Sequence, residues 1–167
     1  MSKGKVNFFE ESFEGLNQDY SKRIVINTLN KDWQPSPVSG VERVYLERDD
    51  KGEKAKASSI VKFLPESSFD MHTHEYGEEF LVLEGIFSDQ YGDYPKGTYV
   101  RNPDKSSHNP FSKDGCTIFV KLRQFNKDDI KRVVKKTYDL PWYKGLVSGL
   151  FVMPLHEYET EHAALVK

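Results

Sequence analysis

The sequence of 167 residues has only one cysteine, Cys116. A single cysteine cannot form a disulfide within the chain, which excludes a disulfide-stapled extracellular scaffold and favours a reducing, cytoplasmic location. The stretch that begins at Met1 lacks the apolar core of a secretory signal, which favours the same location. Cys116 shares strand parity with Ile118 and Val120, so we expect its thiol to lie in the core.

Long hydrophobic runs and a strong net charge are also missing. No apolar segment approaches the roughly 20 residues that a membrane-spanning helix needs, so no membrane partner is expected. The 24 basic and 26 acidic residues give a formal net charge of −2, which offers no reason to expect nucleic acid as a partner. The one basic cluster is predicted to be a solvated surface segment; it consists of Lys131, Arg132, Lys135 and Lys136.

The chain also lacks a long apolar repeat with the helical period, and its best helix candidate, residues 127–136, is short and basic. Short segments rich in β-branched and aromatic residues alternate instead with turn residues. The aromatic share of 13%, with 11 Phe and 9 Tyr, favours strands over helices. The pattern predicts an all-β sandwich or barrel. The predicted strands cover residues 23–27, 41–47, 57–64, 79–83, 97–102 and 116–125.

An internal repeat is visible in the sequence. Residues 33–40 resemble residues 142–149, with a Trp, a Val, a Ser and a Gly in register. An apolar strand follows each copy, and residues 57–62 then resemble residues 162–167. The first copy continues into a histidine-rich segment, whereas the second stops at this point. The sequence therefore predicts one complete unit followed by the opening strands of another.

This repeat suggests three parts of the chain. Residues 1–28 form an N-terminal extension with a first strand, residues 29–126 form the barrel, and residues 127–167 form a linker and a partial repeat. The strands predicted at residues 150–155 and 162–167 must pair somewhere, because unpaired strand edges promote aggregation. They can pack on their own barrel or exchange with a second copy. Exchange is the favoured alternative and predicts a homodimer with an isologous interface.

The residues that carry chemistry gather in one segment. His72 and His74 are two positions apart, so in an extended chain both side chains point to the same face. Glu78 shares their parity. A fourth ligand must come from another strand, and His108 is the remaining histidine of the barrel-like region. Three imidazoles and one carboxylate suit Zn²⁺, Fe²⁺, Mn²⁺, Ni²⁺ or Cu²⁺.

The spacing of these residues resembles the two sequence motifs of the cupin superfamily. The first motif is similar to His72-x-His74-x₃-Glu78-x₆-Gly85, and the second to Gly97-x₅-Pro103-x₄-His108. Lys105 stands where many cupins have a glycine.

Within the cupins, the chain resembles the ChrR-type group most specifically in three runs, residues 77–85, 97–103 and 115–121. The likeness to this group extends over about residues 33–125. That group includes the metal-binding domain of ChrR anti-sigma factors and the acetylacetone-dioxygenase-like proteins. The resemblance implies a double-stranded β-helix with additional C-terminal strands. It also implies one divalent metal ion per chain, zinc or iron first, with manganese and nickel as alternatives.

Several functions agree with such a site. The first is a metal-dependent, dioxygenase-like enzyme that acts on a small molecule. The alternatives are a non-catalytic regulatory cupin that senses a metal, a ligand or oxidative stress, and a fold whose zinc is structural. No catalytic acid or base is identified from the sequence.

Other polar residues near these motifs are expected outside the site. We expect Glu79 at the rim of the barrel, and Arg101 and Lys121 at the surface. His156 and His162 lie in the partial repeat and are predicted not to be metal ligands.

Overall fold

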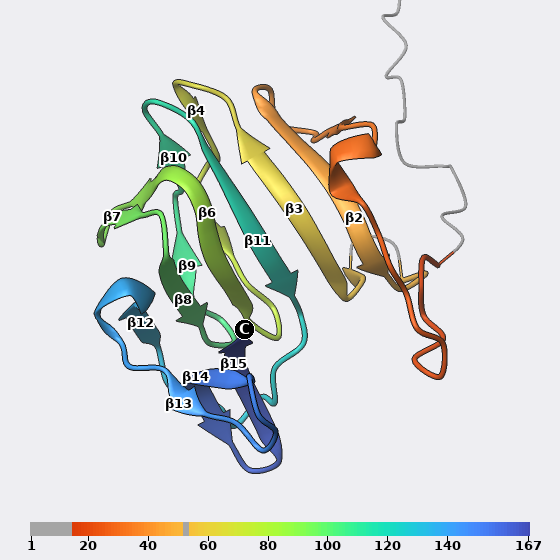
Figure 1. Cartoon of the computed structure of the whole chain (residues 1–167). Coiled ribbons are helices and arrows are strands. Elements are labelled where there is room, and N and C mark those ends of the chain that lie inside the picture. Colours follow the sequence, from red (N-terminus) through yellow and green to blue (C-terminus); the bar gives the residue numbers. More distant parts are fainter. Residues whose placement is uncertain (1–14, 52–53) are drawn as a thin grey trace, which may run out of the picture.

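The computed structural model describes residues 15–51 and 54–167, so residues 1–14 of the predicted N-terminal extension lie outside the described residues (Figure 1). The described chain is built almost entirely of short strands. In chain order the elements are η1 (Thr28–Asn30), β1 (Gln34–Pro35), β2 (Val41–Arg48), β3 (Ala57–Phe63), β4 (Ser67–Ser68), β5 (His72–Thr73), β6 (Glu78–Asp89), β7 (Gly92–Pro95), β8 (Thr98–Asn102), β9 (Ser107–His108), β10 (Phe111–Ser112), β11 (Cys116–Leu122), β12 (Val133–Lys136), η3 (Thr137–Asp139), β13 (Tyr143–Lys144), β14 (Phe151–Tyr158) and β15 (Glu161–Val166).

The strands form a barrel with a separate small sheet beside it. The main sheet runs β1-β2-β3-β11-β6-β10-β4, with β7 and β8 also pairing with β6, and every pairing is antiparallel. Strands β13, β14 and β15 form a three-stranded sheet of their own at one end (Figure 1). The predicted all-β barrel with additional C-terminal strands is therefore confirmed. None of the described helices has the length or apolar character needed to span a bilayer.

Two predicted elements are wrong. Residues 23–27 form no strand, and Ile24 and Val25 are exposed, so this segment lacks the side-chain burial that stabilises a strand. The helix candidate at residues 127–136 is not helical either. Its second half forms β12, which pairs with β8 and buries Val133, so tertiary pairing overrides local helix preference. The basic residues of this segment remain at the surface, as predicted, with Lys135 half-buried.

The interior of the barrel is filled by one face of the main sheet. The register places Val41, Phe63 and Cys116 opposite one another across β2, β3 and β11, and all three are buried in the same apolar cluster. Phe80 and Val82 of β6 belong to that cluster as well. The predicted core position of Cys116 is confirmed, and burial raises the pKa of its thiol to about 11.

The sequence repeat is also a structural repeat. Each copy consists of a 3₁₀ turn (η1 or η3), a short strand (β1 or β13) and a long strand (β2 or β14) paired with a following strand (β3 or β15). The Lys62 ammonium lies 4.0 Å from the centre of the Trp33 ring, and the Lys167 ammonium lies 4.2 Å from that of Trp142. In both copies, the same cation–π contact therefore joins the Trp near the start of the repeat to the Lys at its end.

The C-terminal sheet packs on the outer face of its own barrel. Met153 and Leu155 of β14 meet Tyr99 of β8 and Val133 of β12 in a second apolar cluster, to which Leu81 contributes from β6. This packing satisfies the strands of the partial repeat within one chain. The homodimer formed by strand exchange stays a prediction.

Beside that apolar cluster, a buried ionic network joins the C-terminal sheet to the barrel. Arg101 of β8 is fully buried and donates hydrogen bonds to Glu79, Asp129 and Glu161 over 2.8–3.1 Å. The guanidinium also lies 3.5 Å from the centre of the Phe125 ring. These hydrogen bonds connect β8, β6, the loop before β12 and β15.

The network corrects three placements expected from the sequence. Arg101 was expected at the surface and Glu79 at the rim, but the C-terminal sheet covers both, and Glu79 is only 5% exposed. Lys121 is half-buried, with its ammonium 3.3 Å from the Glu79 carboxylate. Packing on the barrel was one of the two alternatives for the partial repeat, but which face it would cover could not be read from the sequence.

Replacement of Arg101 by Met should lower the free energy of unfolding by roughly 3–5 kcal/mol, because it leaves buried Glu79 with only the half-buried Lys121 and buried Asp129 with only His156 as partners. Urea denaturation followed by circular dichroism measures this change. Lys96→Met, at an exposed position on the loop before β8, is the control and should change stability by less than about 0.5 kcal/mol. A loss below about 1 kcal/mol for Arg101→Met would contradict the role assigned to the network.

Candidate metal centre

The local backbone brings the predicted histidines together. Strands β5 and β9 pair so that His72 lies directly opposite His108. The His74 N–H donates to the Ser106 carbonyl over 2.9 Å, and the Lys105 N–H donates to the His74 carbonyl over 2.8 Å. Lys105 has a φ of 63°, so it adopts the left-handed conformation in which glycine is usual. The turn therefore keeps its shape without glycine.

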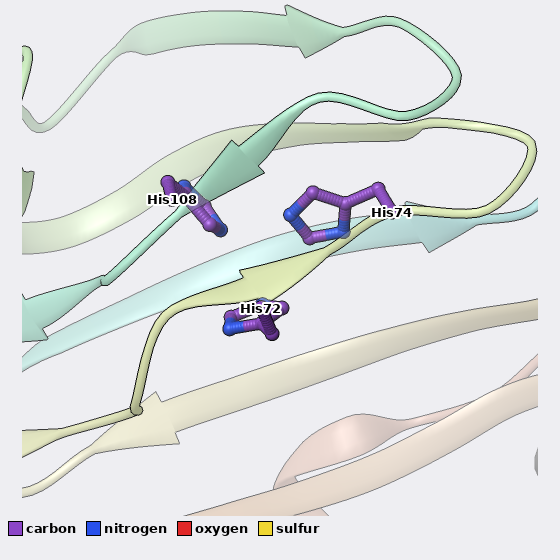
Figure 2. Close-up of side chains that lie close together, drawn as sticks. All are labelled: His72, His74 and His108. Atoms are coloured by element: carbon purple, nitrogen blue, oxygen red, sulfur yellow. The ribbon is translucent and has the colours of Figure 1, made fainter.

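The three imidazoles face one another (Figure 2). Their ring centres are 4.8 Å apart for His72 and His74, 5.0 Å for His72 and His108, and 4.7 Å for His74 and His108. One nitrogen of each ring lies within 4.8 Å of the corresponding nitrogens of the other two. This arrangement could hold a metal ion.

The chemistry of the nitrogens fits such a role. His108 is 2% exposed and His74 is 7% exposed, and the Nε2 atoms of both are buried with no hydrogen-bond partner. Buried polar atoms are normally paired in folded proteins, so two orphaned nitrogens that face a third imidazole call for a ligand. Burial lowers the pKa of His74, which favours the neutral form that binds metal.

Neighbouring oxygen atoms fix the orientation of two rings. The Nδ1 atom of His108 lies 3.2 Å from an Asp89 carboxylate oxygen, and that of His72 lies 2.9 Å from the Asp70 carbonyl. Because these oxygens accept, each Nδ1 carries the proton and each Nε2 keeps its lone pair. Asp89 in turn accepts from the Tyr94 hydroxyl over 3.0 Å.

Sequence reasoning missed Asp89 and its supporting role. Its place at the end of β6 becomes meaningful only once the barrel brings that end beside β9, and no local pattern signals it.

Glu78, the fourth residue predicted from the sequence, lies beside the histidines. Its Oε2 atom is 3.5 Å from the Nε2 atoms of both His74 and His108, and it accepts a hydrogen bond of 3.2 Å from the Asn102 amide. Burial acts to raise the pKa of Glu78, but the imidazoles outweigh burial and leave that pKa below its ordinary value. The structure thus brings all four predicted residues together.

The remaining histidines lie elsewhere. His156 Nε2 is 2.8 Å from an Asp129 oxygen in the ionic network, and His162 is exposed on β15. Among the described residues, the group of potential ligands consists of His72, His74 and His108 and contains neither of them.

A cavity of about 240 Å³ opens beside the histidines inside the barrel. Its walls combine apolar side chains with a few polar groups, which is typical of sites for small molecules. The apolar lining includes Phe63, Phe69, Phe87, Ile118, Val120 and Leu122, and the polar lining includes Arg43, His72, His74, Glu78 and Arg123.

The fold is shared with solved cupin structures. A glyoxylate-induced protein from Pseudomonas aeruginosa aligns with 95% of this chain and 69% of its own, at 14% identity and a TM-score of 0.61. An acetylacetone dioxygenase from Acinetobacter johnsonii aligns with 76% of this chain and 94% of its own, at 15% identity and a TM-score of 0.55. At these identities the likeness shows the fold alone.

Other comparisons are narrower. A solved chain from the complex of Rhodobacter sphaeroides SigE with the anti-sigma ChrR aligns at 19% identity and a TM-score of 0.48. The alignment covers 57% of this protein and 51% of the solved chain, so this protein spans about half the length of the solved chain. No curated protein matches the sequence. The family model described as the ChrR cupin-like domain matches residues 21–126, and the chain therefore belongs to the ChrR cupin-like family.

Proposed function

We propose that the protein is a metal-dependent, dioxygenase-like enzyme that acts on a small molecule in the barrel cavity. The observation that carries the proposal is the convergence of three imidazoles on one point, two with buried, unpartnered Nε2 atoms, at the wall of that cavity. His72, His74, Glu78 and His108 hold one divalent metal ion per chain.

The distances support Glu78 as the fourth ligand. Two atoms that each bind a metal at about 2.1 Å with a tetrahedral angle are about 3.4 Å apart. The Glu78 oxygen is 3.5 Å from each of two imidazole nitrogens, close to that separation, which supports its place in the ligand set. The donor set suits zinc or iron first, and manganese or nickel as alternatives.

The residues of the chain have separate roles in this proposal. A bound divalent ion supplies Lewis acidity for substrate oxygens and, in the case of iron, reactivity with O₂. Asp89 holds His108 in the tautomer that presents Nε2. The apolar walls, which include Phe69 and Phe87, limit the access of water to the cavity.

The dioxygenase-like character is inferred from the fold shared with the acetylacetone dioxygenase. A regulatory role that senses oxidants through a thiol is disfavoured, because Cys116 is buried and its pKa is raised to about 11. The enzyme is expected in the cytoplasm.

The double replacement of His72 and His74 by Ala should abolish metal binding, because it removes two of the three imidazoles. We expect about one metal ion per chain in wild-type protein purified without chelators, and less than about a tenth of that in the variant. Metal analysis by plasma mass spectrometry measures both. His162→Ala is the matched control and should keep the full metal content. Equal metal content in the double variant would refute the site.

The metal affinity should fall as the pH drops. An imidazole must be neutral to bind, so protons compete with the metal for the ring nitrogens as the pH falls. Burial lowers the pKa of His74, so this ring is protonated only at a lower pH than an ordinary imidazole. The lowered pKa of Glu78 keeps the carboxylate charged between pH 7 and pH 5. Titrations at pH 7 and pH 5 should differ by about tenfold or more in affinity. An affinity that stays constant between these values would argue against histidine ligation.

The enzymatic part of the proposal is tested separately. Protein loaded with Fe²⁺ should consume O₂ when supplied with small dicarbonyl compounds, and zinc-loaded protein should not, because zinc has no redox chemistry. An oxygen electrode follows the reaction. The His72→Ala/His74→Ala variant with the same amount of iron sets the background. If the iron-loaded wild-type protein consumed O₂ no faster than this background with any of the dicarbonyl compounds, the dioxygenase assignment would be refuted. The proposed metal site would not be affected.

A further inference from the structure

Two arginines line the same cavity as the histidines. Arg43 of β2 lies opposite Val61 of β3, which lies opposite Ile118 of β11, and Ile118 lies opposite Val82 of β6. The other three members of this row pack in the apolar interior of the barrel. Arg43 therefore extends a row of interior side chains with a positive charge.

The contacts of Arg43 leave part of its guanidinium unused. Its Nη2 donates to the Ser36 hydroxyl over 2.8 Å and its Nη1 to the Tyr45 hydroxyl over 3.2 Å. Its Nε is buried without a hydrogen-bond partner. Both acceptors are neutral hydroxyls, so they leave the charge of Arg43 uncompensated.

Arg123 reaches the cavity from the segment after β11. Its φ is 60° and its backbone N–H donates to the Gly77 carbonyl over 2.9 Å, which fixes the residue beside the histidine segment. Its side chain makes one contact of 3.4 Å to the Ala55 carbonyl, and its Nε is also buried without a partner.

Neither guanidinium forms an ion pair within the described parts of the chain. Arg101, in contrast, is held by three carboxylates on the outer face of the same barrel. Glu75 and Glu78 also line the cavity, so its acidic and basic side chains balance until a divalent ion binds at the histidines and makes the cavity positive. Each guanidinium still has a buried Nε–H without a partner. Such a cavity is complementary to an anion.

We infer that the cavity binds a small organic acid, whose carboxylate is held by Arg43 and Arg123 while a second oxygen function faces His72, His74 and His108. The inference rests on the proposed function, for which it names the substrate class. Guanidinium groups present planar forks of donors that match a carboxylate. A cavity of about 240 Å³ lies below the range of about 300–1,000 Å³ that is usual for ligand pockets, so it suits a small molecule. The apolar walls favour an organic acid over an inorganic oxyanion.

A pair of nearly isosteric ligands tests this inference. Acetoacetate and acetylacetone share one skeleton, except that a carboxylate oxygen of the first replaces a terminal methyl group of the second. Calorimetric titration of zinc-loaded wild-type protein should give an affinity for acetoacetate at least about tenfold higher. Inorganic phosphate should compete weakly. Equal binding of the two dicarbonyl compounds, or tighter binding of acetylacetone, would overturn the inference, and this comparison needs no variant.

Substitutions then assign the preference to the two arginines. Arg43→Met and Arg123→Met should each weaken acetoacetate binding far more than acetylacetone binding, and together they should remove the preference. Arg23→Met, at an exposed position outside the cavity, is the matched control and should keep the preference. A double variant that folds, binds zinc and still prefers acetoacetate tenfold would refute the assignment to Arg43 and Arg123.

The metal content of the same samples separates this inference from the proposed function. Wild-type protein that holds neither zinc after loading nor any other divalent metal would refute the proposed metal site. The same two ligands titrated into metal-free protein would then decide whether the arginines select an anion. Zinc-loaded protein without anion preference would overturn only the inference made here.

Discussion

The alternation of side chains along β6 is the constraint on which the rest of the structure depends. Successive residues of a strand point to opposite faces, so the neighbouring acids Glu78 and Glu79 have opposite environments. Glu78 faces the histidines inside the barrel, whereas Glu79 faces Arg101 on the outside. A shift of one residue in the pairing of β6 would exchange these environments and remove both the candidate metal centre and the ionic network.

The two faces handle buried charge differently. Outside the barrel, Arg101 is compensated by three carboxylates, so that region is closed and structural. Inside, the imidazoles and two arginines are accompanied by Glu78 at their centre and by Glu75 at the margin of the cavity. Complete pairing stabilises a fixed arrangement, while incomplete pairing leaves donors for a ligand. The difference in pairing, rather than burial alone, separates the structural charges from the candidate functional ones.

The partial repeat explains why the outer face can be buried at all. Strands β13 to β15 reproduce the opening of the barrel, including the contact between a Trp ring and a Lys ammonium, but they form a sheet without a histidine segment. Their apolar side chains cover Tyr99 and Leu81 and bring Glu161 to Arg101. The duplicated segment thus covers the outer face of β6 and β8. The inner face of the same strands still borders the cavity and can contact a ligand.

The sequence by itself determined the all-β class and the core position of Cys116, because strand parity is a local property. It also predicted that His108 joins His72, His74 and Glu78, but through the spacing of the two cupin motifs and not through local geometry. Only the tertiary structure decided the rest. It turned residues 133–136 into a strand, because the edge of β8 offered partners. It buried Glu79 and Arg101 under a sheet that begins at Tyr143, more than 40 residues further along the chain. It also placed Asp89, Arg43 and Arg123 around the histidines. These contacts join segments distant in the sequence, and their partners are chosen by packing, which no local pattern encodes.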